Sequence, residues 1–159
     1  MHNRDTRRTA ALQLFLRIAL SASFLSAVAD RFGFWSAANS SWGDWEHFVA
    51  YSQTVNSFAG PQTNNILAIV STALEILLPI FLLAGYKTKF AAIASGILLL
   101  SFALAMTYSL GIKSSLDYSV WTAAAASFAL STFSYYRYSV DYLISKRIDG
   151  NKRQGGELG

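Results

Sequence analysis

Residues 66–86 read ILAIVSTALEILLPIFLLAGY, a stretch of 21 residues with one charged side chain, Glu75. About 20 apolar residues are what a helix needs to cross the roughly 30 Å hydrocarbon core of a bilayer. In lipid, a single segment of this length can satisfy its backbone groups only as a helix. Glu75 is the tenth residue of the stretch, so we expect a membrane helix with a carboxylate near its middle.

Three more stretches of similar length and character lie at residues 10–29, 90–110 and 118–136. Four apolar segments in one short chain predict an all-α fold, a transmembrane four-helix bundle that forms a single domain over residues 1–144. The polar, Gly-rich segment 145–159 is predicted to be a disordered cytoplasmic tail.

The composition agrees with a lipid environment, since 53% of the residues are hydrophobic and 14% are charged. Soluble domains carry about 25% charged residues. The chain has no cysteine, which excludes disulfides and thiolate-held iron–sulfur clusters within it. Both histidines, His2 and His47, lie outside the apolar stretches, so we expect no haem and no metal site. The basic residues form no stripe with interleaved aromatics, and nucleic acid is not an expected partner.

Lysine and arginine are distributed unequally between the two sides of the predicted bundle. With the N-terminus inside, ten of them fall on the inner side and two, Arg31 and Lys113, on the outer side. The inner ten are Arg4, Arg7, Arg8, Lys87, Lys89, Arg137, Lys146, Arg147, Lys152 and Arg153. Cytoplasmic loops are enriched in basic residues, so both ends are predicted to be cytoplasmic and the protein to lie in the inner (plasma) membrane.

The long outer loop between the first two spans contains a helical pattern. Its residues Trp45, Phe48, Val49 and Ser52 recur at helical spacing, which predicts a short amphipathic helix over Trp42–Val55 on the outer surface. Four tryptophans fall at or near this side, as expected of an interfacial belt. They are Trp35, Trp42, Trp45 and Trp121.

The first apolar stretch also has features of a secretory signal. Basic residues precede it, and Ala27-Val28-Ala29 follows the A-x-A cleavage pattern. Cleavage after Ala29 would leave three spans. Arg17 interrupts the apolar run and the run is long for a signal, which favours a retained membrane helix.

Small residues at four-residue spacing predict the helix contacts. They are Ala19, Ser23 and Ala27 in the first span, Ala92 and Gly96 in the third, and Ala123 and Ser127 in the fourth.

Arg17 and Glu75 are the two charged residues inside the predicted spans, where a charge costs at least about 2.5–3.5 kcal/mol on insertion scales. The simplest expectation is that they pair inside the bundle. Either Glu75 accepts a proton or binds a polar ligand head with Arg17 beside it, or the pair only fixes helix packing. Pro79, one turn after Glu75, lacks an N–H and frees the carbonyl of Glu75.

A second set of polar residues lies at the outer end. Asp30 is expected to pair with Arg31 or Lys113 at the mouth of the bundle, and Thr107 lies at a similar level. Together they suggest an outward-facing polar pocket. Asp117 is expected to cap the fourth helix.

Three stretches carry a resemblance to a known family. Residues 12–33 (LQLFLRIALSASFLSAVADRFG) resemble the first helix of the DoxX family, with its early arginine and charged exit. Residues 75–100 (EILLPIFLLAGYKTKFAAIASGILLL) are similar to its second and third helices, where a glutamate precedes a Gly and a short basic turn. Residues 110–128 (LGIKSSLDYSVWTAAAASF) resemble the loop and fourth helix of a DoxX-like branch.

This resemblance implies a four-helix membrane bundle linked to redox chemistry at the quinone pool. The family takes its name from a subunit of a terminal quinol oxidase with thiosulfate:quinone oxidoreductase activity, and other members look like partners in membrane complexes that handle oxidative or thiol stress. Carried onto this chain, the resemblance implies Glu75 and Arg17 as the catalytic positions. The expected quinone site contains them together with Asp30 and Thr107. Because this chain lacks cysteine, electrons must come from a quinone or a partner's cofactor.

We therefore expect the membrane subunit of a quinone-linked redox complex, with a redox subunit as partner. If the chain is an enzyme, it is a quinone-dependent oxidoreductase subunit. The alternative is a non-enzymatic membrane scaffold or assembly protein. A small-solute transporter is a third reading; the chain shows no internal repeat, though a homo-oligomer would supply further helices.

Overall fold

The computed structural model describes residues 2–147, and its regular structure there is entirely helical. The helices are α1 (His2–Arg31), α2 (Trp45–Val55), α3 (Pro61–Ala84), α4 (Thr88–Leu110), α5 (Ile112–Asp117) and α6 (Val120–Ser131). A further helical segment is described over residues 140–147. The rest of the predicted tail lies outside the described residues.

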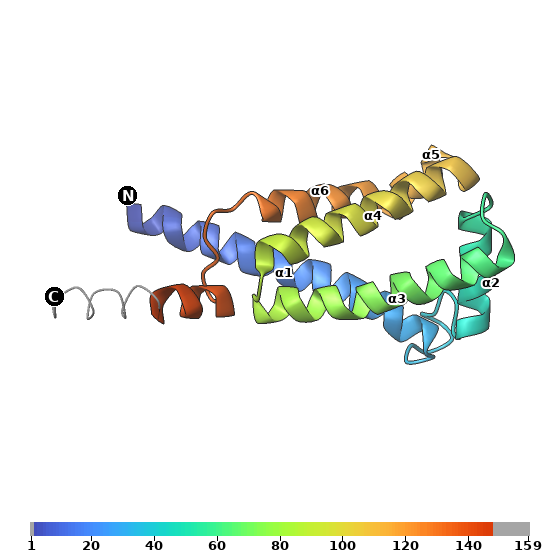
Figure 1. The fold of residues 1–159 in the computed structure, drawn as a ribbon, viewed down its shortest axis with the longest axis horizontal. Coiled ribbons are helices and arrows are strands. Elements are labelled where there is room, and N and C mark those ends of the chain that lie inside the picture. The colour runs from blue at the N-terminus through green and yellow to red at the C-terminus, as the bar shows by residue number, and fades with distance from the viewer. Residues whose placement is uncertain (1, 148–159) are drawn as a thin grey trace.

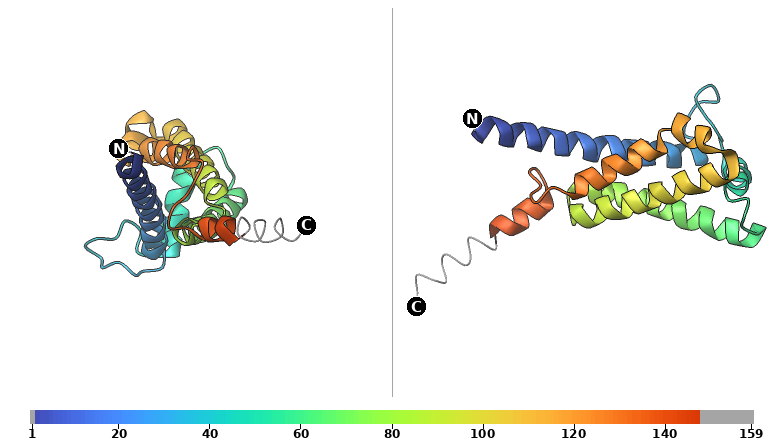
Figure 2. Two further views of the ribbon diagram at one scale, coloured as in Figure 1. Left: turned by 90° about the vertical axis from the view of Figure 1, so that its left-hand side faces the viewer. Right: turned by 90° about the horizontal axis from the view of Figure 1, so that it is seen from above.

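Four of these helices run side by side along the long axis of the molecule (Figure 1). Contacts between α1 and α3, α3 and α4, α4 and α6, and α6 and α1 connect them in a ring, which the end view in Figure 2 shows. The start of α1 and the segment 140–147 lie at one end. At the other end α2 runs across the bundle and contacts α3 and α4.

Within the described residues, three helices are long and apolar enough to cross a membrane. They are Arg7–Arg31 of α1, Pro61–Ala84 and Thr88–Leu110. The 24 residues of α3 extend about 36 Å at 1.5 Å per residue, more than the hydrocarbon core requires. The apolar helix α6 has 12 residues and extends about 18 Å.

The fourth apolar stretch differs from the continuous helix predicted for residues 118–136. Helix α6 begins after Ser119, which has a left-handed backbone conformation (φ 55°), and ends at Ser131. Beyond that end, the Tyr136 hydroxyl donates a hydrogen bond to the Leu130 carbonyl over 3.0 Å. A side chain thus satisfies a carbonyl near the helix end, where carbonyls lack an intrahelical partner.

The buried and exposed faces of α3 are reversed relative to those of a helix in a water-soluble protein. Its buried face includes the polar side chains of Asn64, Thr72 and Glu75. Its exposed face carries large apolar residues, among them Ile66, Leu67, Ile69, Val70, Leu77, Ile80, Phe81 and Leu83. In lipid, polar groups face the interior of a bundle and apolar groups face the acyl chains.

Helix α1 shows the same reversal. Gln13, Arg17 and Ser21 are buried, whereas Phe15 and Ile18 are exposed. Contiguous exposed apolar surface of this extent marks contact with something other than water. The chain is therefore a helical membrane protein.

Close packing of α4 against α6 depends on Gly96. A Cβ atom at this position would lie 2.7 Å from Cε1 of Phe128 on α6. Ala92, Gly96 and Ser127 are buried, which confirms the predicted small-residue contacts of these two helices. The prediction for α1 is wrong, since Ser23 is exposed and its hydroxyl bonds back to its own helix.

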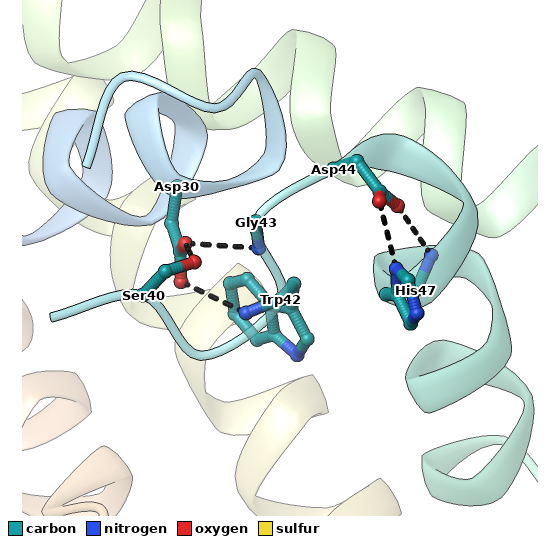
Figure 3. A network of polar contacts seen from close by, with 6 residues as sticks. All are labelled: Asp30, Ser40, Trp42, Gly43, Asp44 and His47. Atoms are coloured by element: carbon teal, nitrogen blue, oxygen red, sulfur yellow. Dashed lines mark hydrogen bonds and ion pairs between the residues drawn. The ribbon is translucent and has the colours of Figure 1, made fainter. Parts of the chain in front are cut away.

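The amphipathic helix predicted in the first loop is confirmed as α2, which begins three residues later than expected. Asp44 caps it, accepting a hydrogen bond from the backbone N–H of His47 over 2.9 Å (Figure 3). That hydrogen bond, together with the His47 ring, holds the pKa of Asp44 below its usual value. The helix buries Phe48, Ser52 and Val55 against the bundle.

Candidate functional site

A buried ion pair joins the end of α1 to the middle of α3. The guanidinium of Arg31 lies 2.7 Å from the carboxylate of Glu75, measured from Nη2 to Oε2. Arg31 also donates from Nη1 to the Thr72 hydroxyl over 2.6 Å. Thr72 and Glu75 are three residues apart and therefore share one face of α3. Glu75 is 1% exposed and Arg31 4%, so both charges are removed from the surroundings of the bundle.

Aromatic rings cover the other side of this ion pair. The guanidinium carbon of Arg31 lies 3.7 Å from the ring centre of Phe48 on α2 and 5.4 Å from that of Trp42. The two rings contact each other edge to face with 5.2 Å between centres. A cation over an aromatic face is attracted by the ring, by about 2 kcal/mol when it is desolvated. Helix α2 is thus held over the ion pair partly by Arg31 itself.

Asp30 organises the loop that places Trp42 there (Figure 3). Its buried carboxylate accepts hydrogen bonds from the Ser40 hydroxyl and from the backbone N–H groups of Ser41, Trp42 and Gly43. The expected pairing of Asp30 with Arg31 or Lys113 is wrong, because the carboxylate instead serves as the anchor of its own loop.

Several polar atoms of the ion pair have no hydrogen bond within the described residues. These atoms are both carboxylate oxygens of Glu75 and the Nε of Arg31, and all three are buried. Glu75 Oε2 is paired by charge with Arg31 Nη2 at 2.7 Å, so Glu75 Oε1 and Arg31 Nε are the atoms left without a partner among the described residues. Unpartnered buried polar atoms carry a cost of about 1–3 kcal/mol each, more when charged. One acceptor oxygen and one donor nitrogen thus keep hydrogen-bonding capacity that the described residues do not use.

Arg17 does not pair with Glu75, and that prediction is wrong. Its Nε and Nη2 donate to the carbonyls of Leu82 and Leu83 over 2.6 and 2.9 Å, and its Nη1 donates to the Tyr138 carbonyl over 3.1 Å. The last carbonyls of a helix lack intrahelical partners and carry partial negative charge, so a guanidinium binds well there. Arg17 therefore caps α3 and fastens it to the segment after α6.

Gly85 makes room for this cap. It has a left-handed conformation (φ 67°), and a Cβ atom there would lie 2.6 Å from Nη2 of Arg17 and 2.5 Å from Cβ of Ser139. Pro79 lies buried one turn before the cap, and the Ser21 hydroxyl approaches its carbonyl to 3.4 Å. The inner end of α3 is thus held by side chains of α1.

The remaining predicted site residues lie elsewhere. Thr107 exchanges a hydrogen bond with the Ser115 hydroxyl of α5 over 2.8 Å, while Asp30 is engaged by its own loop. Asp117 ends α5 and pairs with Lys113 four residues earlier, so the prediction that it caps the fourth helix is wrong. The expected pocket containing both Asp30 and Thr107 is not formed by these contacts.

Two surface hollows of the described chain lie away from the ion pair. One, of about 460 Å³, is at the turn between α3 and α4, and the other is lined by Phe58, Leu104 and Tyr108. No group of three His, Asp or Glu side chains suited to a metal occurs among the described residues.

Sequence reasoning missed Arg31, Phe48 and Trp42 as site residues. The spacing of Thr72 and Glu75 does indicate a shared polar face on one helix. Such a face predicts a hydrogen-bond donor on a neighbouring helix. Arg31 lies just beyond the predicted first span, whereas Arg17 lies inside it and was therefore expected to pair with Glu75. The packing of α1 against α3 brings Arg31 to Glu75 instead.

Comparison with known proteins identifies a family for this chain. A family model described as DoxX matches residues 12–108, which cover α1 from Leu12 onward, all of α2 and α3, and most of α4. No curated protein and no solved structure matches the chain. Because the matched segment is more than half of the 159 residues, the chain belongs to the DoxX family.

Proposed function

We propose that this protein spans the inner membrane four times with both ends in the cytoplasm, and serves as the membrane subunit of a quinone-linked redox complex. In this arrangement α6 and its flanking residues form the fourth crossing, and α2 lies at the outer surface. The distribution of lysine and arginine supports the orientation. The Arg31–Glu75 pair is the proposed site.

The buried carboxylate of Glu75, whose Oε1 has no partner among the described residues, is the observation that carries this proposal. It is buried near the middle of α3 beside Arg31 Nε, which also lacks a partner. Ionisable groups inside membranes are costly and mark ligand or proton pathways. A carboxylate that served packing alone would gain stability from hydrogen bonds that are missing here.

The residues present fit a quinone head group in their chemistry. Arg31 Nε can donate a hydrogen bond to a ring oxygen, Glu75 can accept one from a ring hydroxyl, and Phe48 and Trp42 offer flat apolar surfaces. When bound, a quinone would supply the electron acceptor and the proton acceptor of the reaction. Glu75 would hold or release the proton, and Arg31 would keep the carboxylate oriented.

Access to this site requires movement of α2. Neither of the two hollows described above is lined by Glu75, and Phe48 and Trp42 cover Arg31 directly. A ligand would therefore enter by displacing these rings, with the loop anchored on Asp30 acting as the hinge. Arg17 is a positioning residue in this proposal, since it caps α3 and has no contact with the pair.

Photolabelling and activity measurements test the proposal together. A short-chain ubiquinone carrying a photoreactive azide is expected to label α2 or α3 in native membranes, and Glu75→Gln is expected to abolish quinone-dependent turnover while the protein stays inserted. Glu46→Gln makes the same chemical change on an exposed residue of α2 and is the matched control. Full turnover in Glu75→Gln would exclude the proton role.

A second function, a scaffold or assembly protein, is favoured by the closed packing of the ion pair under α2. In that case the pair is purely structural, and replacing both charges by apolar residues should preserve complex assembly. Loss of turnover with intact assembly in the double variant favours the redox function. Retention of turnover and of assembly in the double variant favours the scaffold function.

A further inference from the structure

We propose that the cleft at the turn between α3 and α4 binds an anionic phospholipid. The cleft has a volume of about 460 Å³ and lies at the end of the bundle opposite α2. Lys87 and Lys89 line it together with Phe90, Ile93 and Asp141. It is separate from the ion pair of Arg31.

The two lysines supply positive charge that forms no ion pair with the side chains that the structure describes. Both are exposed, and neither forms an ion pair with a carboxylate of residues 7–147. The ammonium of Lys87 lies 5.7 Å from the ring centre of Tyr86, its own neighbour in the chain. Because both lysines line the same cleft, both contribute positive charge to an anionic group bound there.

Asp141 shapes the cleft and forms no ion pair with either lysine. Its carboxylate accepts hydrogen bonds from the backbone N–H groups of Lys87 and Thr88, both over 2.8 Å, and from the Thr88 hydroxyl over 2.9 Å. Its own N–H donates to the Gly85 carbonyl over 3.0 Å. The negative charge is thus offset by the amides that begin α4. Both carboxylate oxygens are occupied, and the lysine ammonium groups remain available.

An apolar track continues from the lysines along α4. Phe90 is 68% exposed, and Ile93 and Ile97 follow it at helical spacing on the same face. A ligand that satisfies both features has a phosphate at one end and a long hydrocarbon at the other. A soluble phosphate would leave the track uncovered, and a neutral lipid would leave the lysines unpaired.

The inference depends on the membrane placement stated under Proposed function. In that orientation the cleft opens at the cytoplasmic leaflet, where anionic lipids attract basic residues close to the membrane. It does not involve Glu75 or a quinone, so its test is independent of the redox role.

Native mass spectrometry of the full chain in neutral detergent tests the inference. The protein is titrated with phosphatidylglycerol and with phosphatidylcholine of the same acyl chains. We expect preferential retention of phosphatidylglycerol, and a loss of roughly 10- to 30-fold in its affinity in Lys87→Gln/Lys89→Gln, on the strength of one charge contact per lysine. Binding of phosphatidylcholine should stay unchanged in that variant.

Lys113→Gln is the matched control, because Lys113 is an exposed lysine at the opposite end that pairs with Asp117. Lys89→Gln alone replaces the double variant if the latter unfolds at a lower temperature than the wild type. Equal retention of the two lipids, an equal loss in Lys113→Gln, or displacement of the lipid by inorganic phosphate would each overturn the inference.

Discussion

The pairing of Glu75 with Arg31, and not with Arg17, can be measured with double-mutant cycles. The perturbations are Glu75→Gln, Arg31→Met and Arg17→Met, singly and in the two combinations that contain Glu75→Gln. Removing one partner from a buried ion pair costs about 3–5 kcal/mol. After Glu75→Gln, Arg31 retains its hydrogen bond to Thr72 and its contact with the Phe48 ring. Because these contacts remain, we expect Glu75→Gln to lower the free energy of unfolding by about 3 kcal/mol, the lower end of that range.

The two cycles should differ clearly in their coupling free energies. Glu75 and Arg31 are in contact, so their effects should be coupled by about 2–3 kcal/mol, and the double variant should be more stable than the sum of the two single losses predicts by that amount. Arg17 has other partners, so its effect should add to that of Glu75→Gln within about 0.5 kcal/mol. Reversible unfolding in mixed micelles with increasing SDS gives each free energy. Strong coupling to Arg17, or none to Arg31, would refute the geometry.

Three further predictions concern single positions. Gly85→Ala should destabilise the protein by more than about 2 kcal/mol, because the new methyl group would clash with Arg17 and the backbone at this residue is left-handed. If the variant melts at the same temperature as the wild type, the proposed cap is contradicted. Gly96→Ala should cost about 1–3 kcal/mol by overpacking, and Phe128→Leu in the same chain should recover part of it; the free energy of unfolding of both variants checks this. Asp44 has a lowered pKa, so its stabilisation of α2 is present above about pH 4 and is lost as the pH falls through the lowered value. Asp44→Ala should abolish this pH dependence in hydrogen exchange of α2, and an unchanged profile would argue against the cap.

The membrane helices were predictable because their information is local. Residues 66–86 and 90–110 are apolar over the length of a bilayer, and α3 and α4 are found there. Helix α2 was also predictable, from the recurrence of Trp45, Phe48 and Ser52 at helical spacing. The end of the fourth helix was not predictable in this way, because it depends on the hydrogen bond that the Tyr136 hydroxyl donates back to the Leu130 carbonyl.

Within the candidate site, Glu75 was identifiable from its charge in an apolar run, but its partner was not. Arg17 and Arg31 occur in the same helix, 14 residues apart, and either has a side chain long enough to reach a neighbouring helix. Their partners depend on the crossing of α1 and α3, which brings Arg17 to the end of α3 and Arg31 to its middle.

The sequence by itself determined that this chain is a helical membrane protein of the DoxX family, because hydropathy, helix length and motif spacing are properties of contiguous residues. The tertiary structure alone decided which charges meet and what covers them. Phe48 and Trp42 reach Arg31 through a loop that Asp30 organises, and contacts between segments so far apart in the chain follow from packing in three dimensions.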